Sequence, residues 1–368
     1  MHFDRRLAAN FDWGTLLLTL AITAFSVILL YSATAYRTDG LSSIYLKQLT
    51  WVGIGLTCMF IILLVDYQVL CRYAFVLYGC IIISLIAVLL FGRVINGAQR
   101  WLMLGPWQLQ TSEFAKPVII LVLARYFSED AQQNNAALDL RDLIFPVLLV
   151  SLPFLLIAKQ PDLSTSVVLL AILGVMLAMV PLHKKTLLVI SITTICTLPA
   201  AWYVLAEYQR DRLLALFSPN TDLLGAGYHS WQSKIAIGSG GLWGKGLLAG
   251  TQSRLHFLPE RHTDFIFAVL GEELGFIGVL VVLSLFASLL IHGFTTAFHS
   301  RDRLGTFITL GVITMLMTHI FLNIGMTTGL LPIVGLPLPL LSYGGSSLVA
   351  TFLSLGLIMN VHMRRFKF

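Results

Sequence analysis

The chain has 368 residues, of which 57% are hydrophobic and only 11% are charged, whereas an average soluble protein carries charge on about 25% of its residues. A mean hydropathy of +0.85 and long apolar runs exclude a soluble enzyme, a disordered protein and a nucleic-acid-binding domain. The net charge of +6 instead indicates the basic cytoplasmic face of a membrane protein, because lysine and arginine gather on that side.

Ten apolar runs follow one another along the chain, separated by charged, polar or Pro/Gly-rich segments. A transmembrane helix needs about 20 mostly apolar residues, and most of the runs approach this length. We therefore predict an all-α integral membrane protein with about ten transmembrane helices, in a single polytopic domain over residues 1–368. The predicted spans are 13–35, 48–66, 73–91, 114–128, 143–158, 163–182, 186–206, 264–292, 304–329 and 343–363.

An even number of spans places both termini on one side of the membrane. With the N-terminus inside, the short inner segments carry more lysine and arginine than the short outer loops, so the positive-inside rule predicts that both termini are cytoplasmic. The basic start of the chain (Arg5, Arg6) precedes an apolar run without an A-x-A-like cleavage site, which predicts a retained first helix. The segments on the outer face are then 92–112, 159–162, 207–263 and 330–343.

The first outer segment carries a polar cluster that continues into the fourth span. Arg100 lies in the loop, and Glu113 and Lys116 stand three residues apart, so on a helix they share one face. A charge at bilayer depth costs about 2.5–3.5 kcal/mol on insertion scales, so Lys116 is expected to pair with another group or to line a wet cavity. An internal Glu–Lys ion pair and a cationic wall for an anionic headgroup are compatible interpretations.

The second outer segment is the tight turn Lys159-Gln160-Pro161-Asp162 between the fifth and sixth spans. Pro161 restricts Gln160 to an extended backbone, and Asp162 is well placed as the N-cap of the sixth helix. Capping accounts for Asp162, but it does not account for Lys159, a cation at the end of an otherwise apolar helix.

The third outer segment, 207–263, is predicted to be a large structured extracytoplasmic loop between the seventh and eighth spans. It carries the basic residues Arg210, Arg212 and Lys234, which make it a candidate surface for an anionic lipid headgroup. Segments 228–237 and 247–258 mix aromatic, apolar and basic residues, as interfacial helices do.

A glycine-rich run within this segment, 238–246, looks like a phosphate-binding loop. It fails as a Walker A motif, because Ser239 stands where the first glycine belongs and neither Ser nor Thr follows Lys245. Its backbone N–H groups remain candidates for holding a lipid pyrophosphate.

The fourth feature is the run His262-Thr263-Asp264 at the outer start of the eighth span. Asp264 suits a helix N-terminus, where the dipole favours an anion, and it equally suits a catalytic carboxylate. Glu272 lies about 12 Å deeper along the helix and is followed by Glu273. Two adjacent glutamates within a span are unfavourable, so one of them is expected to meet a basic partner. Metal binding by the histidine and the aspartate stays open, although two ligands are a weak signal and no H-E-x-x-H pattern is present.

The last outer segment, 330–343, is rich in proline, carries no charge and leads through Ser342 into the tenth span. Broken backbone at membrane depth is tolerated only where protein or a water-filled cavity surrounds it. A re-entrant structural turn and a lip of the outer cavity are both open interpretations.

These motifs resemble the SEDS family (shape, elongation, division and sporulation) over essentially the whole chain. The short N-terminal tail and Arg261 after Pro-Glu resemble RodA-type members of the family more than FtsW-type members. The motifs that carry the resemblance are Asn96–Trp101, Lys159–Leu163, Gln232-Ser233, Leu258–Phe265, Glu272–Gly275 and Pro339–Ser347.

The resemblance implies a peptidoglycan glycosyltransferase that polymerises lipid II into β-1,4 glycan strands at the outer face of the inner (cytoplasmic) membrane, during cell elongation and rod-shape maintenance. It also implies partners: a class B penicillin-binding protein, which is a transpeptidase, other elongation-complex membrane proteins and membrane lipids, but no nucleic acid. An FtsW-type division polymerase, a flippase or transporter of lipid-linked precursors and a non-catalytic scaffold are the alternatives. Transport is disfavoured because the charges gather on the outer half, whereas a translocation path needs polar residues through both leaflets.

Asp264 matches the essential aspartate of the family, and we predict that it is the general base for the acceptor GlcNAc 4-hydroxyl. Basic side chains would stabilise the pyrophosphate leaving group. A divalent cation such as Mg²⁺ would share that task, but no metal-ligand set is evident. Glu113 would orient Lys116, and Glu272 and Glu273 are expected in structural ion pairs. The predicted substrate-binding residues are Arg100, Glu113, Lys116, Lys159, Asp162, Arg210, Arg212, Lys234, His262, Thr263 and Ser342.

Overall fold

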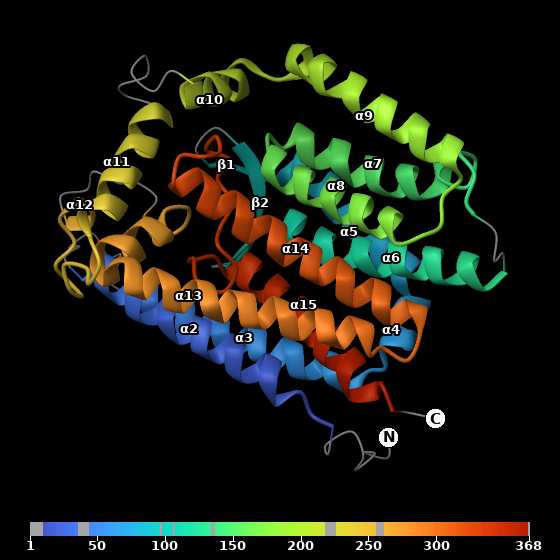
Figure 1. The fold of residues 1–368 in the computed structure, drawn as a ribbon, viewed down its shortest axis with the longest axis horizontal. Coiled ribbons are helices and arrows are strands. Elements are labelled where there is room, and N and C mark those ends of the chain that lie inside the picture. Colours follow the sequence, from blue (N-terminus) through green and yellow to red (C-terminus); the bar gives the residue numbers. More distant parts are fainter. Residues whose placement is uncertain are drawn as a thin grey trace.

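The computed structural model describes residues 10–35, 44–95, 98–105, 107–133, 137–217, 226–254 and 261–366. Long helices dominate this part of the chain (Figure 1), and each predicted span overlaps one of them. These helices are α2 (Trp13–Thr34), α3 (Ile44–Leu64), α5 (Ala74–Phe91), α6 (Thr111–Gln133), α7 (Ile144–Lys159), α8 (Leu163–Ala178), α9 (Lys184–Val204), α13 (Ile266–Phe298), α14 (Arg303–Thr327) and α15 (Gly345–Arg364). Among the described residues, α2, α3, α5, α13, α14 and α15 are long and apolar enough to cross a membrane, while α7 and α8 are apolar but shorter.

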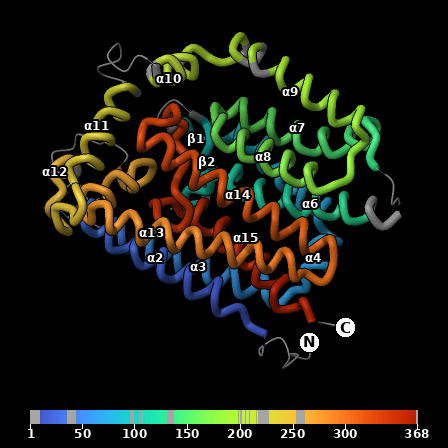
Figure 2. Tube along the Cα trace, viewed as in Figure 1, coloured from blue at the N-terminus to red at the C-terminus, as the bar shows by residue number. Residues whose placement is uncertain are grey.

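The helices pack around α15. In its apolar stretch 83% of the residues are buried inside the protein, compared with 17% in α5. α15 packs most extensively against α3 and also contacts α6, α13 and α14. Small residues allow the close approach that membrane helices need: the ring of Phe352 on α15 occupies the space in which a Cβ of Gly55 on α3 would lie. By contrast, α9 lies at the edge of the bundle (Figure 2), and many of its apolar side chains are exposed.

Polar side chains inside the helices find their hydrogen-bond partners within the protein. On α2, the hydroxyl of Thr19 donates to the carbonyl of Thr15 at 2.7 Å, and the hydroxyl of Thr23 donates to the carbonyl of Thr19 at 2.9 Å. Such bonds one turn back satisfy a hydroxyl where no water is present. The helix begins at an N-cap, Asp12, whose carboxylate accepts from the Thr15 N–H.

The segment between α5 and α6 is a small antiparallel sheet, so the prediction of an all-α protein is wrong here. Strands β1 (Arg93–Ile95), β2 (Ala98–Leu104) and β3 (Trp107–Leu109) lie in the order β1-β2-β3. Gly105 lies directly after β2 with φ +63°, a left-handed conformation that tight hairpin connections often require. The sheet places Arg100 and Trp101 on a rigid strand. Asn96 and Gly97 of the family motif lie outside the described residues.

Segment 207–263 contains helices within its described residues. It contains α10 (Glu207–Phe217), α11 (Ala226–Ser239) and the short α12 (Thr251–Arg254). The helix expected over 228–237 is confirmed by α11. Of the second expected helix, 247–258, only the four residues of α12 are helical in the described part of the chain. Residues 255–260 lie outside the described residues.

The glycine-rich run packs against a break in α13. Gly275 has φ +63° and ψ −163°, which interrupts the hydrogen-bond ladder of the helix. The N–H of Phe276 donates to the carbonyl of Gly241 at 2.9 Å instead. The two backbones approach so closely that a Cβ at Gly244 would collide with the Glu273 carbonyl, which explains why glycine is needed on both sides.

The same contact uses the N–H groups that were candidates for binding pyrophosphate. The N–H of Lys245 donates to the carbonyl of Glu272 at 3.0 Å, and the N–H of Gly246 donates to the carbonyl of Glu273 at 2.9 Å. The N–H of Gly244 donates within the run, to Gly240 at 2.8 Å. The run therefore holds the broken helix in place, and the N–H groups of Gly244, Lys245 and Gly246 are already bound to protein carbonyls. Pyrophosphate binding by the rest of the run stays a prediction.

The adjacent glutamates of α13 have different partners. Oε1 of Glu272 accepts from Lys245 Nζ at 2.8 Å and from the Thr251 N–H at 2.8 Å, which confirms the expected basic partner. Oε1 of Glu273 accepts from Ser32 Oγ at 2.6 Å. Among the described residues Glu273 forms no ion pair, so that expectation is wrong for the second glutamate, whose Oε1 accepts from a hydroxyl instead.

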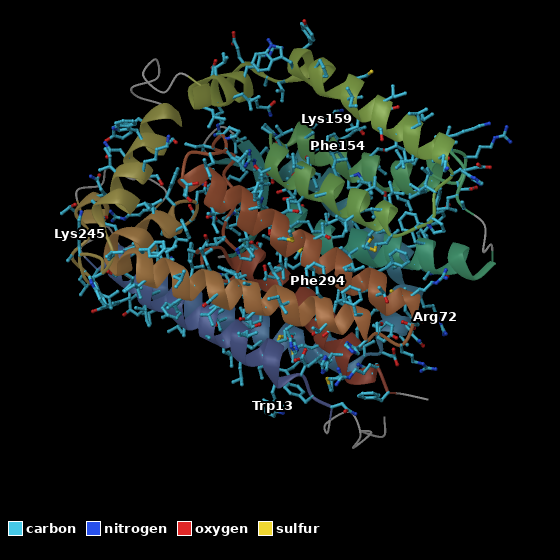
Figure 3. All side chains as sticks on the ribbon, viewed as in Figure 1. Trp13, Arg72, Phe154, Lys159, Lys245 and Phe294 are labelled. Carbon is cyan, nitrogen blue, oxygen red and sulfur yellow. The ribbon has the colours of Figure 1, made fainter. Side chains whose placement is uncertain are left out.

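The beginning of α2 and the end of α15 lie at the same end of the bundle. Asp12 Oδ2 and His362 Nδ1 are 3.9 Å apart, and Arg364 pairs with Asp66 at 3.4 Å. Figure 3 shows Arg72, at the end of α4 (Tyr67–Arg72), near this end and Lys245 at the opposite end. Arg72 and Arg364 thus lie at the end of the bundle where α2 begins and α15 ends.

Candidate functional site

A cavity of about 380 Å³ opens between the small sheet, α10, the beginnings of α6, α8 and α13, and the irregular segment before α15. It brings together side chains that are far apart in the sequence, including two arginines and three carboxylates. The lining residues are Arg100, Trp101, Gln108, Gln110, Glu113, Asp162, Thr165, Arg212, Thr263, Asp264, Val334, Gly335, Leu336, Pro337, Tyr343, Gly344, Ser346 and Ser347. Six of the predicted site residues are among them: Arg100, Glu113, Asp162, Arg212, Thr263 and Asp264.

Asp264 is half-buried in the cavity wall, two residues before α13 begins. Nδ2 of Asn323 donates to the Asp264 carbonyl at 3.0 Å and to the Leu336 carbonyl at 2.6 Å. One side chain of α14 therefore fixes both the aspartate and the irregular segment opposite it. Gly335 has φ +70°, and a Cβ there would lie 3.2 Å from Asp264 Oδ2, so the carboxylate lies directly over this glycine.

Asp162 is buried at the start of α8, where it acts as the predicted N-cap. Its Oδ1 accepts from the Thr165 N–H at 3.3 Å, and its Oδ2 accepts from the Thr165 hydroxyl at 2.9 Å. Oδ2 also accepts from Gln110 Nε2 at 3.1 Å and from Ser112 Oγ at 3.2 Å. The aspartate thus joins the starts of α6 and α8.

Arg100 and Arg212 are each held by backbone carbonyls. Nε of Arg100 donates to the Gln160 carbonyl at 3.1 Å, and its guanidinium also donates to the Pro161 carbonyl. Nη1 of Arg212 donates to the Ile333 carbonyl at 3.2 Å. Both arginines also line a second cavity of about 80 Å³, so they stand where a polar and an apolar cavity meet. The remaining lining residues of the second cavity are Pro161, Leu163, Ser164, Leu205, Gln209, Leu213, Pro332, Ile333 and Val334.

Lys116 lies below the main cavity and is 2% exposed. Its Nζ donates to Glu113 Oε2 at 2.8 Å, which confirms the predicted ion pair. Nζ also lies 2.9 Å from His319 Nε2, and the other ring nitrogen of His319 lies 3.3 Å from the Pro337 carbonyl. If Nδ1 carries the ring proton and donates to that carbonyl, Nε2 accepts from the ammonium. The three side chains then form one chain of hydrogen bonds from α6 to the irregular segment.

Several predicted substrate-binding residues do not line the cavity. Ser342 is buried, and its Oγ accepts from the Leu338 N–H at 2.8 Å, so it stabilises the turn before α15. The His262 ring lies 6.0 Å from the Tyr343 ring at the cavity edge. Arg210 donates to the carbonyls of Trp202 and Tyr203 at the end of α9. Lys159 and Lys234 are exposed.

Two functional positions were missed by reasoning from the sequence: His319 and Asn323. They stand four residues apart on α14, so they share one face of a largely apolar helix. Both are buried, and both contact the irregular segment that forms the cavity wall. A histidine and an asparagine at helical spacing inside a span were the available signal.

Two of the three carboxylates in the cavity already accept hydrogen bonds from the protein itself. Asp162 already accepts four hydrogen bonds, and one oxygen of Glu113 is bound to Lys116. Mg²⁺ prefers oxygen ligands, but these oxygens serve the protein's own donors. The geometry therefore assigns the cavity's positive charge to the arginines.

Residues 13–367 match the family described as "Cell cycle protein" that comprises FtsW, RodA and SpoVE. The chain is 40% identical over 358 residues to peptidoglycan glycosyltransferase MrdB of Escherichia coli (strain K12), covering 97% of this chain and 94% of that protein.

Solved structures show the same fold. A chain from the structure "Structural coordination of polymerization and crosslinking by a peptidoglycan synthase complex" is 33% identical, with a TM-score of 0.81, covering 97% of this chain and 99% of the other. The crystal structure of the rod shape determining protein RodA of Thermus thermophilus is 31% identical, with a TM-score of 0.71, covering 97% and 98%. This chain is thus a multi-pass membrane protein that belongs to the FtsW/RodA/SpoVE family, the SEDS family.

Proposed function

We propose that this chain is a RodA-type peptidoglycan glycosyltransferase that polymerises lipid II into β-1,4 glycan strands during cell elongation. The observation that carries the proposal is the cavity in which Asp264, Arg100 and Arg212 come together. The 40% identity to a peptidoglycan glycosyltransferase over nearly the whole chain supports the same activity.

All ten helices that match the predicted spans cross the membrane in this proposal, with both termini in the cytoplasm and segment 207–263 outside. Asp264 and His292 stand near opposite ends of α13, about 40 Å apart at 1.5 Å per residue, which matches a bilayer with its headgroup regions. The arginine-rich end beside Asp12 faces the cytoplasm. The cavity therefore opens on the outer side, where glycan strands are needed.

The reaction is one inverting displacement. The 4-hydroxyl oxygen of the acceptor GlcNAc attacks the anomeric carbon of the donor, while the bond from that carbon to the pyrophosphate oxygen breaks. Asp264 takes the hydroxyl proton, and the lipid pyrophosphate leaves with the bonding electron pair. The α-linked donor becomes a β-1,4 linkage, and one general base suffices.

Arg100 and Arg212 stabilise the charge that grows on the leaving pyrophosphate. Because they stand between the polar cavity and the smaller apolar one, the sugars lie beside Asp264 and the start of the lipid tail beside Leu163 and Leu213. Glu113 lines the cavity, while Lys116 and His319 lie behind its wall, and the three side chains together keep that wall in place. A divalent cation is not needed for this assignment of charges.

The chain acts beside a class B penicillin-binding protein, which crosslinks the strands. Support comes from the structural relative described as a synthase complex that coordinates polymerization and crosslinking. The substrate-binding assignments made from the sequence remain part of this proposal for Thr263 and His262, which lie at the cavity and its edge.

Polymerisation of fluorescent lipid II by the purified chain with its penicillin-binding protein tests the proposal. Asp264→Asn is expected to abolish polymer formation, because the amide cannot take the proton. Asp211→Asn is the matched control, since Asp211 is an exposed aspartate on α10, and it is expected to polymerise like the wild type. Normal polymer from Asp264→Asn, in a complex that elutes intact, would refute the assignment of the base. Failure of the wild type in the same intact complex would refute the activity itself.

A further inference from the structure

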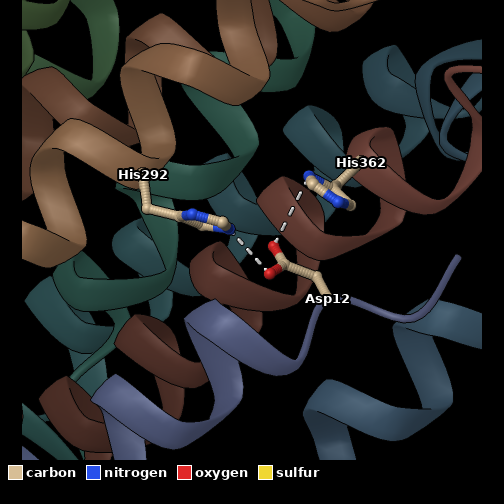
Figure 4. A group of neighbouring side chains, drawn as sticks. All are labelled: Asp12, His292 and His362. Atoms are coloured by element: carbon tan, nitrogen blue, oxygen red, sulfur yellow. Dashed lines mark hydrogen bonds and ion pairs between the residues drawn. The ribbon is translucent and has the colours of Figure 1, made fainter.

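The beginning of α2 and the ends of α13 and α15 lie at one face of the bundle, and one metal-binding side chain is found at each of them (Figure 4). Asp12 immediately precedes α2, while His292 and His362 lie in the final turns of α13 and α15. One ligand atom of each residue lies within 4.8 Å of the other two. Among the residues that the structure describes, no other group of three such side chains comes this close.

We propose that Asp12, His292 and His362 bind a divalent transition-metal ion of the zinc class, which ties the beginning of α2 to the ends of α13 and α15. Two imidazoles and one carboxylate suit zinc, whereas Mg²⁺ and Ca²⁺ prefer oxygen ligands alone. A tetrahedral ion with three protein ligands keeps its fourth position for water. The site is separate from the outer cavity, about one membrane thickness away along α13.

The distances between the ligand atoms fit such an ion. Zinc bonds of about 2.0–2.2 Å at tetrahedral angles place neighbouring ligand atoms about 3.4 Å apart. His292 Nε2 lies 2.7 Å from Asp12 Oδ1, and His362 Nδ1 lies 3.9 Å from Asp12 Oδ2. The two distances end on different oxygens of the carboxylate, and one is shorter and one longer than the ideal value. Side-chain rotations are therefore needed to bind the ion, and the ion replaces the hydrogen bond between His292 and the aspartate.

The carboxylate is held in place by groups behind it. Oδ1 of Asp12 accepts from the Thr15 N–H at 3.0 Å, and Oδ2 accepts from the Thr15 hydroxyl at 2.7 Å. Metal ligands are commonly oriented by such second hydrogen bonds. Asp12 itself is 2% exposed, so its direction is fixed before an ion arrives.

The two imidazoles are also positioned by their neighbours. A Cβ at Gly14 would lie 3.0 Å from His292 Cε1, so the missing side chain leaves room for the ring against α2. The hydroxyl of Thr296 lies 3.1 Å from His362 Nδ1, so an ion bound through this nitrogen replaces that contact. The two rings are stacked with centroids 5.6 Å apart. A structural histidine–aspartate pair explains His292, and the contact with Thr296 explains part of the placement of His362. Neither contact requires both imidazoles to lie within reach of one carboxylate.

The site is open to an ion from one side. The His292 side chain is 30% exposed and that of His362 is 13% exposed, while the carboxylate of Asp12 is shielded. Solvent therefore reaches the imidazoles first, and the fourth ligand is a water on that side. An ion held there adds a direct link among three helix ends that are otherwise joined by two side-chain hydrogen bonds, one between His292 and Asp12 and one between Thr296 and His362.

Zinc content of the full-length protein tests the proposal. The protein, carrying an affinity tag without histidine, is equilibrated with Zn²⁺ in detergent, desalted and analysed by elemental mass spectrometry. The wild type is expected to retain about one zinc per chain, and the double variant His292→Asn/His362→Asn less than about one tenth of that. His299→Asn is the matched control, because His299 lies at the same face but bonds to the Thr295 carbonyl at 2.8 Å, and it is expected to retain the ion.

Two further measurements separate a metal site from a structural role. Thr15→Val is expected to weaken zinc binding about 10–100-fold in competition with a chromophoric chelator. The Co²⁺-loaded wild type is expected to show the visible absorption of a four-coordinate ion with nitrogen ligands. This measurement does not depend on the folding of any variant. Equal zinc in the wild type and the double variant, or a six-coordinate cobalt spectrum, would overturn the proposal.

Discussion

Gly335 lies beneath the carboxylate of Asp264, and Gly335→Ala tests how closely the cavity positions this group. Its φ of +70° belongs to the left-handed region, where an alanine costs about 1–2 kcal/mol. The added Cβ would also lie 3.2 Å from Asp264 Oδ2, so the carboxylate has to move by a few tenths of an ångström. Since a displacement of about 1 Å in a reacting group can lower the rate about 100-fold, we expect a loss of about tenfold in the polymerisation rate.

Gly105→Ala separates the two effects of this substitution. Gly105 has a similar φ of +63°, but no atom lies within 4 Å of the position its Cβ would take. Both variants are expected to lose similar stability in thermal unfolding, while only Gly335→Ala loses the rate of lipid II polymerisation. Equal rates for the two variants would refute the argument that Asp264 is placed by its contact with Gly335.

Three further substitutions test the buried polar contacts. Glu113→Gln leaves Lys116 buried without its counter-charge and is expected to lower the free energy of unfolding by about 3–5 kcal/mol, measured by chemical denaturation. The double variant Glu113→Gln/Lys116→Gln should recover most of this loss. If the double variant is as unstable as the single one, the ion pair does not account for the loss. Lys245→Ala leaves Glu272 without its cation and should cost about 1–3 kcal/mol, seen as a lower melting temperature that the exposed control Lys184→Ala does not show. Asn323→Ala releases the backbone at Asp264 and should lower kcat of polymerisation more than it changes KM, whereas an unchanged kcat would show that the aspartate is fixed by other contacts.

Local patterns in the sequence were sufficient to predict the positions of the long helices and the contacts within one helix turn. The apolar runs located every long helix, because span length follows directly from bilayer thickness. The cap formed by Asp162 and the pair formed by Glu113 and Lys116 were predicted correctly, since each depends on residues three positions apart. Such contacts are encoded locally and need no knowledge of the fold.

Contacts between distant segments could not be predicted from one sequence. The small sheet was missed because three short strands with mixed polarity give only a weak alternating pattern. Nothing near Lys116 in the sequence indicates His319, and nothing near Asp264 indicates Asn323. Ser32 on α2 forms a hydrogen bond with Glu273 on α13. The sequence predicted a cation beside this glutamate, and only the packing of the two helices shows that a hydroxyl takes that place.

The catalytic proposal depends on irregular backbone, and the structure explains how that backbone stays rigid inside a membrane protein. Unpaired carbonyls are unfavourable at this depth, and side chains from other helices bind those of the segment before α15. Asn323 binds the Leu336 carbonyl at 2.6 Å, and Ser26 on α2 donates to the Leu341 carbonyl at 2.6 Å. Gln48 on α3 donates to the Ser342 carbonyl at 3.2 Å. Because three different helices fix this segment, the wall facing Asp264 is as rigid as the bundle, and a base held against it needs little reorganisation when the acceptor hydroxyl arrives.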